Sequence, residues 1–495
     1  MSFALVLPSP AAMVWHRAAV DAVAAATGEA VQVVRVAAPP LPTPVRLLIE
    51  LERLVRGVRP GHPALPDPAP PAGEAAVAAG RLAIDLAAGP ATGRRLVLRC
   101  DGLPVDLGAA AAMTAGTTPV LTLDLEDGTE RRRLVAWAVA VENRSVFVAG
   151  LSNIYGRAID LVARAARQVA AGRPAEAIDL GPVATPGPAV RAGSAAGFMA
   201  ASIANVATRR LGRMLRLKPE WHVGVRPDDG SDGIPDLAGR PFRLIPDDGA
   251  RFLADPFPAA RDGRRVVFVE ELPFSTGKGV ISSVEIAADG TPGALRPVLE
   301  LDCHLSYPYL LEEDGTLYMV PETSGRGTVE LWRCIDFPGR WELDTVLISG
   351  CDLSDASPMR DGEGWAMFAN GRARWCSTWD AVELWRAPAL RGPWRRCGDG
   401  PFLVDVRTAR PAGAPFHVGG RVVRPVQDSS ERYGGALAFA AMDDLGARPA
   451  QTVVRRVRPA APLLGLHTWN RGGGLEVVDV FGPRIRGPVV VARPD

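Results

Sequence analysis

A repeat in the C-terminal half of the chain constrains the fold more than any other feature. Two short strands joined by a D-G or G-G turn recur, as in "YPYLLEEDGTLYMVPET", "SPMRDGEGWAMFAN" and "APFHVGGRVVRPVQD". Each pair is followed by a loop, a third strand such as "TVELWRC" or "AVELWRAP", and a fourth such as "DTVLISG". Four short strands in every stretch of roughly 50 residues are typical of a propeller blade.

The spacing of two anchor positions predicts the number of blades. The polar residue that ends the second strand recurs at steps of 52, 48 and 57, at Glu270, Glu322, Asn370 and Gln427. The start of the first strand recurs at steps of 52, 50, 56 and 54, at Asp255, Tyr307, Ser357, Gly413 and His467. Five starts predict five blades. The last unit is one strand short, so we expect "WHVGVRP" or "PFRLIP" to close the ring, because an open edge leaves backbone groups unpaired.

The first half of the chain has a different composition and pattern. It is rich in alanine, and nine of the eleven tryptophans lie from Trp221 onward. Strand-like and helix-like segments alternate in "SFALVLP", "MVWHRAAVDAVAAATG", "AVQVVRV" and "VRLLIELERLVRG". This order predicts a Rossmann-like α/β domain, so the fold class is α/β followed by an all-β five-bladed propeller. No G-x-G-x-x-G follows the first strand, so dinucleotide binding is not supported.

A basic amphipathic segment connects the two halves. Apolar residues recur every four positions at Met199, Ile203, Ala207, Leu211 and Leu215. The cationic residues that follow, with no acid among them, are Arg209, Arg210, Arg213, Arg216 and Lys218. Two interpretations stay open: residues 199–218 contact a membrane surface, or the helix is a linker that packs its apolar stripe on a domain. We expect an α/β domain over 1–190, a linker helix over 195–218 and a propeller over 219–495.

Charge and cysteine usage exclude several classes of function. The net charge of +1 gives no electrostatic basis for binding nucleic acid. Six cysteines without a C-x-x-C pair indicate neither a zinc site nor a disulfide framework, and we expect no metal and no cofactor. The start has no basic segment before its apolar run, and no run of about 18 apolar residues occurs. We therefore expect a cytoplasmic protein, with membrane association left open.

Polar residues recur at the two ends of the inner strand pair of each unit. In a propeller these positions face one opening of the central channel, and polar groups that converge in a concave opening are the usual ligand site. The candidate site residues are Asp255, Glu270, His304, Tyr307, Glu322, Asp355, Arg410, Gln427, Asp428, His467 and Asn470. Structural roles are the alternative: Asp255 as a turn cap, His304 and His467 as packed histidines, and Glu322 with Arg410 as an ion pair between blades.

Several motifs resemble a known family. They are "ADPF", "HLSYPYLLEEDGTLYMVPET", "FPGRWEL", "VELWRAPALRGPW", "ARPAGAPF", "RPVQDSSERYGG" and "HTWN". Over roughly residues 220–485 the chain resembles the N-terminal domain of the glucosamine inositolphosphorylceramide transferase family and, more distantly, the propellers of family 43 glycoside hydrolases. Roughly residues 1–175 resemble a formyltransferase-like domain, in "DLEDGTERRRLVAWAVAV" and "IYGRAIDLVARAARQVAAG". That family uses a histidine, and none lies between His62 and His222, which implies a degenerate domain without the chemistry.

The glycoside hydrolase resemblance implies candidate catalytic residues. Those enzymes carry an Asp base on the first blade, an Asp on the second and a Glu acid on the third. Asp255 matches the first position, Ser306 and Tyr307 stand at the second, and Asp355 stands at the third. The candidate catalytic residues are Asp255 as base or nucleophile and either Glu322 or Asp355 as acid, although the family pattern itself assigns no role to Glu322. The remaining candidates would bind the substrate.

Two classes of function follow from this resemblance. One is an enzyme of envelope polysaccharide metabolism that hydrolyses or transfers glycosyl units of a glycan or glycolipid. The other is a non-catalytic glycan-binding accessory protein that works beside a separate glycosyltransferase. A formyltransferase-like activity is the least favoured.

Overall fold

The N-terminal part of the protein is built on one mixed sheet, in strand order β2-β1-β3-β4-β5-β6. In the computed structural model all residues are described except 1, 11, 90–92, 182–192, 215–217, 363, 447–448, 486 and 494–495. The chain divides into two units, and each is considered by itself. Unit 1 comprises Met1–Leu211 with Arg372–Ser377 and Leu403–Asp405, and unit 2 comprises the remainder.

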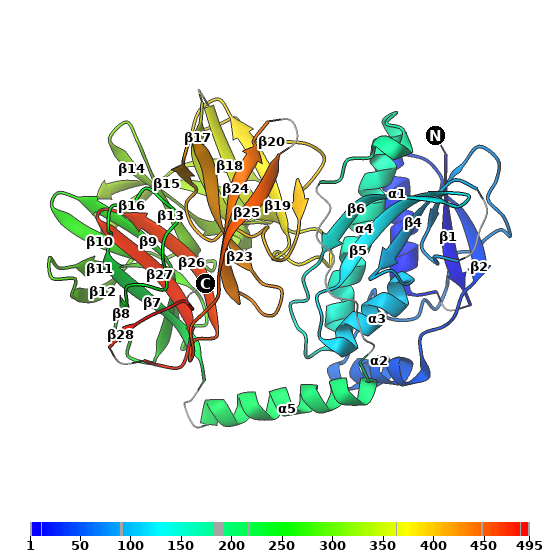
Figure 1. Cartoon of the computed structure of the whole chain (residues 1–495), viewed down its shortest axis with the longest axis horizontal. Helices are drawn as coiled ribbons and strands as arrows, with labels where there is room; N and C mark the ends of the chain where they lie inside the picture. The colour runs from blue at the N-terminus through cyan, green and yellow to red at the C-terminus, as the bar shows by residue number, and fades with distance from the viewer. Residues whose placement is uncertain are drawn as a thin grey trace. The chain divides into compact units, whose positions relative to one another are not determined.

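The sheet of unit 1 is parallel from β2 to β4 and antiparallel from β4 to β6 (Figure 1). Its strands are β1 (Phe3–Ser9), β2 (Gln32–Ala37), β3 (Leu82–Asp85), β4 (Arg95–Cys100), β5 (Val120–Asp127) and β6 (Glu130–Ala138). The helices are α1 (Val14–Thr27), α2 (Thr43–Arg56), α3 (Val105–Ala115), α4 (Phe147–Ala170) and α5 (Ala195–Met214), with a 3-10 turn η1 (Ala175–Ala177). The predicted α/β class is confirmed. Among the described helices none has the length and hydropathy to span a membrane.

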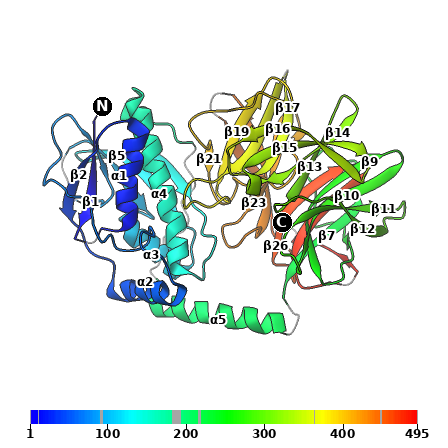
Figure 2. The ribbon, with the colours of Figure 1, turned by 180° about the vertical axis from the view of Figure 1, so that it is seen from behind.

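Unit 2 is a five-bladed β-propeller, as the repeat predicts (Figure 2). Blade 1 contains β9 (Arg251–Arg261), β10 (Arg264–Pro273), β11 (Val280–Ile286) and β12 (Pro292–Leu299). Blade 2 contains β13 (Ser306–Glu313), β14 (Thr316–Thr323), β15 (Thr328–Asp336) and β16 (Arg340–Ser349), with a 3-10 turn η2 (Ser324–Arg326) after β14. Blade 3 contains β17 (Leu353–Asp361), β18 (Gly364–Gly371), β19 (Ala381–Ala387) and β20 (Arg395–Arg396). The short strand β21 (Leu403–Val404) is counted with unit 1.

Blade 5 joins both ends of the propeller sequence, which closes the ring. Blade 4 contains β22 (Phe416–Val418), β23 (Arg421–Asp428), β24 (Ala436–Asp444) and β25 (Ala450–Val457). Blade 5 contains β26 (Gly465–Gly472), β27 (Leu475–Gly482), β7 (Glu220–Pro227), β8 (Phe242–Leu244) and β28 (Pro488–Val489). β7 pairs with β27 along its whole length, from Leu475↔Pro227 to Gly482↔Glu220. Both predicted closing segments are used, β7 next to β27 and β8 next to β7.

Apolar residues on the faces of neighbouring blades form the core. Between blades 2 and 3, for example, Tyr309, Val320 and Met367 belong to one buried cluster. Blade 5 contributes Trp469 to another cluster, where its ring contacts Phe439 of blade 4 edge-on at 5.5 Å between centroids. Five tryptophans of the second half belong to such buried clusters: Trp332, Trp341, Trp365, Trp394 and Trp469.

Four first strands carry a bulge at the same register. In blade 2 the pairing moves from Ser306↔Glu322 to Tyr309↔Val320, and blades 1, 3 and 5 show equivalent shifts in their first strand pairs. The first bulged residue adopts a positive φ in three blades, at 49° for Asp255, 44° for Tyr307 and 54° for Asp355. The equivalent of Tyr307 in blade 3 is therefore Asp355. The repeat spacing predicted Ser357 as the start of the first strand in this blade, which is wrong by two residues.

Candidate functional site

The bulges decide where the candidate side chains point. A bulge bends its strand and re-aims a side chain, and bulges are frequent near functional sites. A positive φ is tolerated by Asp but is uncommon for a bulky residue such as Tyr307. Blade 4 has Gly413 near this position, at φ 136°, where an added Cβ would lie 2.1 Å from the carbonyl oxygen of Trp469. The backbone thus adopts an unusual conformation in several blades around the same part of the ring.

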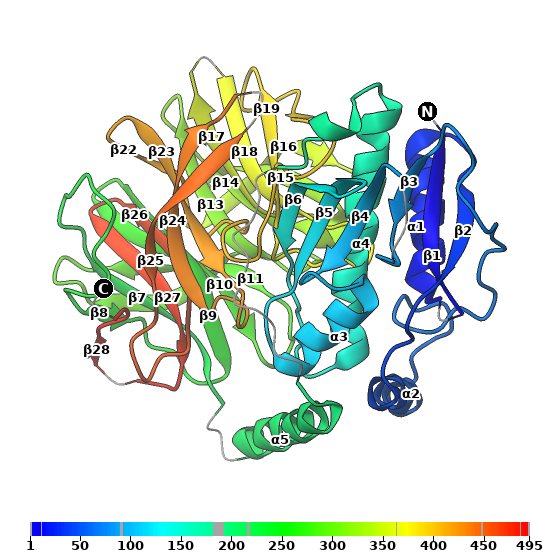
Figure 3. The same ribbon diagram turned by 45° about the vertical axis from the view of Figure 1, so that its right-hand side comes forward.

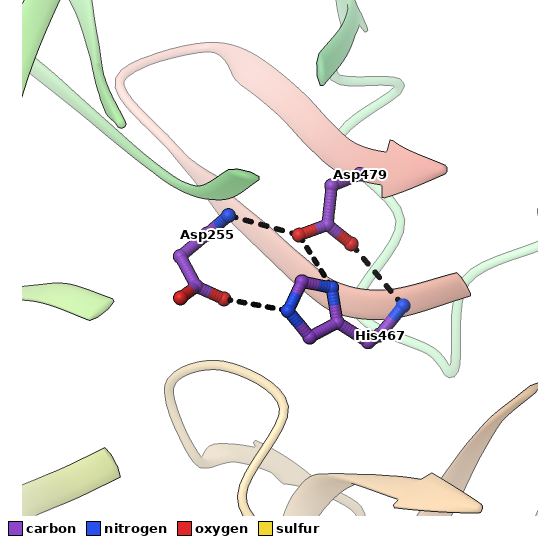
Figure 4. Close-up of side chains that lie close together, drawn as sticks. All are labelled: Asp255, His467 and Asp479. Atoms are coloured by element: carbon purple, nitrogen blue, oxygen red, sulfur yellow. Dashed lines mark hydrogen bonds and ion pairs between the residues drawn. The ribbon is translucent and has the colours of Figure 1, made fainter. Parts of the chain in front are cut away.

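His467 lies between two aspartates at the junction of blades 5 and 1 (Figure 4). Its Nε2 is 3.2 Å from Oδ1 of Asp255, and its Nδ1 is 2.7 Å from Oδ2 of Asp479. Asp479 also accepts hydrogen bonds from the backbone amides of His467 and Thr468, at 3.1 and 2.8 Å, and from that of Asp255 at 2.8 Å. The Thr468 hydroxyl donates to Asp255 at 2.6 Å. All these groups are buried.

The two carboxylates make His467 a cation at neutral pH. Burial lowers its pKa, but Asp479 and Asp255 raise it more, to about 9. Ligand atoms of the three residues all lie within 4.8 Å of one another, which is close enough to hold a metal ion. An imidazolium has no free lone pair for a metal, however, and backbone and hydroxyl donors already occupy the carboxylates. The arrangement fits a hydrogen-bonded charged triad better than a metal centre.

Asp355 and Arg410 form a second buried pair. Arg410 Nε lies 2.6 Å from Oδ2 of Asp355, and its Nη2 donates to Oδ1 at 3.3 Å. Burial raises the pKa of Asp355, with Arg410 opposing and Glu322 and Asp255 adding to the rise. The alternative of an ion pair between Glu322 and Arg410 is wrong, because Arg410 pairs with Asp355. Oε1 of Glu322 instead accepts a hydrogen bond from the Ser324 hydroxyl at 2.7 Å.

Glu270 and His304 form a third pair, which is open to solvent on one side. His304 Nε2 lies 3.2 Å from Oε1 of Glu270, and its Nδ1 accepts the backbone amide of Gly279 at 2.9 Å. The His304 side chain is 44% exposed and that of Glu270 only 9%. The pKa of His304 is raised, because its hydrogen bond to Glu270 outweighs the effect of burial. The pKa of Glu270 is also raised, because burial outweighs the effect of His304. A proton shared by this pair is accessible from solvent.

Aromatic rings lie against His467 and Arg410. Trp221 lies 4.1 Å from His467 between ring centroids, and Tyr433 lies 5.3 Å from it. Trp379 lies 5.2 Å from Tyr433, whose ring also faces the Arg410 guanidinium at 5.1 Å. The three aromatic side chains are only partly buried.

Seven of the sequence-predicted residues come together: six fall into two groups, and Glu270 lies between them. We call the buried charges the framework; with Asp479 added they are Asp255, Asp355, Arg410, His467 and Asp479. Glu270 is buried beside the framework and holds His304. We call the side chains with access to solvent the rim: Trp221, His304, Glu322, Trp379 and Tyr433. The sequence places these positions at one opening of the central channel, and the structure shows that the framework side chains among them are buried.

Four other candidates connect strands and lie outside both groups. The Tyr307 hydroxyl accepts the Gly413 amide and contacts the Ser357 hydroxyl, each at 2.9 Å. Asn470 donates to the Pro256 carbonyl at 2.8 Å and accepts the Ala414 amide at 2.7 Å. Gln427 donates to the Pro411 carbonyl at 3.1 Å. Asp428 pairs with Arg456 at 2.6 Å.

The structure also adds residues that the sequence reasoning missed. Asp479 stands inside the apolar run "LEVVDVFG", and a lone acid in a buried strand is a signal for a paired charge. Tyr433 lies inside the quoted motif "RPVQDSSERYGG" but was not named as a candidate. Trp221 stands in a predicted closing strand, and no feature of the sequence sets Trp379 apart from the other tryptophans.

Comparison with known proteins identifies part of the chain. Residues 246–480 match the family described as Glucosamine inositolphosphorylceramide transferase 1, N-terminal. The framework lies within this segment. The curated proteins of that name from Oryza sativa subsp. japonica and Arabidopsis thaliana are 28% and 25% identical, over 225 and 224 residues. These segments are 45% of this chain and 30% and 29% of the two relatives, so the chain spans under a third of their length.

Solved structures of similar architecture are more distant. An exo-β-1,3-galactanase from Phanerochaete chrysosporium is 10% identical, with a TM-score of 0.32 over 43% of this chain and 51% of that chain. A family 117 glycoside hydrolase from Zobellia galactanivorans is 11% identical, with a TM-score of 0.33 over 54% of this chain and 90% of that chain. These values do not bear on function. The match to the transferase family begins at residue 246, so the formyltransferase-like resemblance of the first half stays a prediction.

Proposed function

We propose that this chain is a carbohydrate-active protein that binds the sugar part of a glycan or glycolipid at the rim of its propeller. One observation carries the proposal: a buried charged framework from blades 1, 3, 4 and 5 supports a rim of aromatic and titratable side chains. Sugars present hydroxyl groups at their edges and apolar C–H groups on their faces. Glu322 and His304 suit the hydroxyl groups, and the rings of Trp221, Trp379 and Tyr433 suit the faces.

The curated relatives support a glycolipid as the class of ligand. They are named glucosamine inositolphosphorylceramide transferases, and 45% of this chain is similar to a part of them. We propose that the protein acts in envelope polysaccharide metabolism, in the cytoplasm or at a membrane, beside a separate glycosyltransferase. In this role a non-catalytic accessory protein needs only the rim and its support.

Glycoside hydrolysis or glycosyl transfer is the second candidate, favoured by the way the carboxyl groups are tuned. Such reactions need one protonated and one ionised carboxyl group. Burial raises the pKa of Asp255, and the imidazolium of His467 opposes this rise, which supports the role of base or nucleophile. Burial raises the pKa of Asp355, which favours a protonated acid, but Arg410 occupies its oxygens. Glu322 is more accessible and is the better acid of the two.

A glycan array with the intact protein tests binding. We expect Glu322→Gln and His304→Gln each to weaken binding of the retained glycan about tenfold, since each loses a charge-assisted hydrogen bond. Glu312→Gln, an exposed substitution on β13, is the matched control and should bind as the wild type does. Wild-type protein that retains no glycan, or rim variants that bind as the control does, would refute the proposal.

Turnover of the retained glycan separates the two candidates. In an enzyme Asp255→Asn should abolish turnover and leave binding in place, provided that its melting temperature shows the fold intact. In a binding protein the wild type itself should show no turnover. Loss of binding and stability together in Asp255→Asn would leave Glu322→Gln as the deciding variant, because Glu322 is not part of the framework.

A further inference from the structure

An apolar groove lies between α2 and α5 of unit 1, outside the site described above. Its volume is about 450 Å³. The larger apolar residues that line it include Leu48, Leu51, Val55, Phe198, Ile203 and Val206. Leu48 and Phe198 form a buried floor, whereas Val55 is 75% exposed and Ile203 is 69% exposed. Figure 3 shows the two helices in neighbouring positions on unit 1.

The outward face of α2 is more apolar than its packing requires. Glu52 holds the helix from its inner side, because its carboxylate accepts the backbone amides of Phe147 and Val148 at the start of α4, both at 2.9 Å. The inner face also buries Leu48 and Ile49. Three leucines of α2 are exposed to solvent: Leu47 is 64% exposed, Leu51 45% and Leu54 69%. A contiguous exposed apolar surface of this kind marks an interaction site.

The charges around the groove select its occupant. Two exposed arginines line it, Arg56 of α2 and Arg210 of α5, and Arg46 and Arg59 are exposed in and just after α2. Glu50 is the only other acid of α2 and forms an ion pair with Arg53 at 2.7 Å. The sequence of α5 contains no acid at all. Leu215 and Arg216 of the predicted basic stripe lie outside the described residues, as do the side chains of Arg209, Leu211 and Arg213.

We propose that α2 and α5 together dock unit 1 on an anionic lipid surface. Amphipathic helices with a basic polar side lie in the membrane interface, where their apolar side chains reach the acyl boundary and their cations meet anionic headgroups. The exposed leucines of α2 and Ile203 of α5 supply the apolar part, and the arginines supply the charge complementarity. The sequence suggested such a contact for residues 199–218 alone, and the structure adds α2 as the larger share. The inference does not rest on the proposed function.

Vesicle flotation with the full chain tests the charge requirement. We expect binding to vesicles of phosphatidylcholine mixed with phosphatidylglycerol, and much weaker binding to phosphatidylcholine alone. Neutralising Arg56 and Arg210 to Gln should weaken binding about 30-fold, from roughly fivefold per arginine near an anionic surface. Arg296→Gln, an exposed arginine of β12 in unit 2, is the matched control and should change nothing. High salt should reproduce the effect of the two substitutions.

A second pair of variants tests the apolar requirement. Leu54→Glu with Ile203→Glu should abolish flotation, and Leu343→Glu, a 47% exposed residue of β16, should not. Both changes are at exposed positions, so the fold should survive, and melting temperatures verify this. Equal binding of wild type and variants to anionic vesicles would overturn the proposal. Sedimentation without lipid supplies a second test. If the wild-type protein self-associates and the double variant Leu54→Glu with Ile203→Glu is monomeric, a second copy of the chain covers the groove and the proposal is overturned.

Discussion

The stability of the propeller should fall at alkaline pH because of one buried histidine. His467 is held between Asp255 and Asp479, which raise its pKa from 6.5 to about 9. In the unfolded chain the same imidazole titrates near 6.5. The folded state therefore keeps a proton that the unfolded state releases, and this difference links stability to pH.

The size of the effect follows from the shift. A change of about 2.5 pKa units at about 1.4 kcal/mol per unit corresponds to roughly 3 kcal/mol. Because the folded pKa is the raised one, this stabilisation is fully present below pH 6.5, declines as the pH rises, and is lost above about pH 9. His467 is 2% exposed, so solvent screening does little to reduce it.

Urea unfolding of the full chain, followed by tryptophan fluorescence, measures this effect. Nine of the eleven tryptophans lie from Trp221 onward, so the signal comes mainly from the second half. The wild type should lose about 3 kcal/mol relative to His467→Gln between about pH 6 and pH 10. His417→Gln, an exposed histidine of β22, should follow the wild-type curve. A difference between wild type and His467→Gln that stays constant over this pH range would refute the reasoning.

Two further substitutions test the framework and the bulges. Arg410→Met should lower the free energy of unfolding in urea by about 3–5 kcal/mol, because it leaves Asp355 buried without its partner. Adding Asp355→Leu to this variant should recover part of the loss. If the effects of the two substitutions are simply additive, the two residues do not act as a pair. Gly413→Ala should lower the free energy of unfolding by more than about 2 kcal/mol, since the new Cβ meets the Trp469 carbonyl. Gly339→Ala is the control and should be neutral, because no atom lies within 4 Å of its added Cβ. Equal melting temperatures for the two variants would argue against the close contact at Gly413.

Most of the propeller could be predicted because its information is local. D-G and G-G turns between alternating strands recur at nearly constant spacing, and each blade repeats the same pattern. The Asp355 register could not be predicted, because a bulge adds a residue to one strand without changing the apolar pattern around it. The sequence also did not predict the order of the later strands in the sheet of unit 1, where β5 and β6 form an antiparallel hairpin.

The site was predictable in its members more than in their roles. Sequence spacing brought Asp255, Asp355, Arg410 and His467 to one region, but it could not show that they are buried. Burial depends on contacts between blades far apart in the sequence, such as Asp255 with His467. Asp479 was missed for the same reason: the residues that it holds belong to another strand and another blade.

The framework links the bulges of successive blades, which explains why so many charges are buried at this place. Asp479 accepts the backbone amide of Asp255, and the Asp255 carboxylate accepts the backbone amide of Tyr307 at 3.2 Å. Asp355 binds Arg410 from the segment that leads into blade 4. Each bulge frees an amide from strand pairing, and the carboxylate of the neighbouring blade satisfies the amides of Asp255 and Tyr307. A change at Asp255 thus affects two blades, so its effect on a ligand can be interpreted only beside its effect on unfolding.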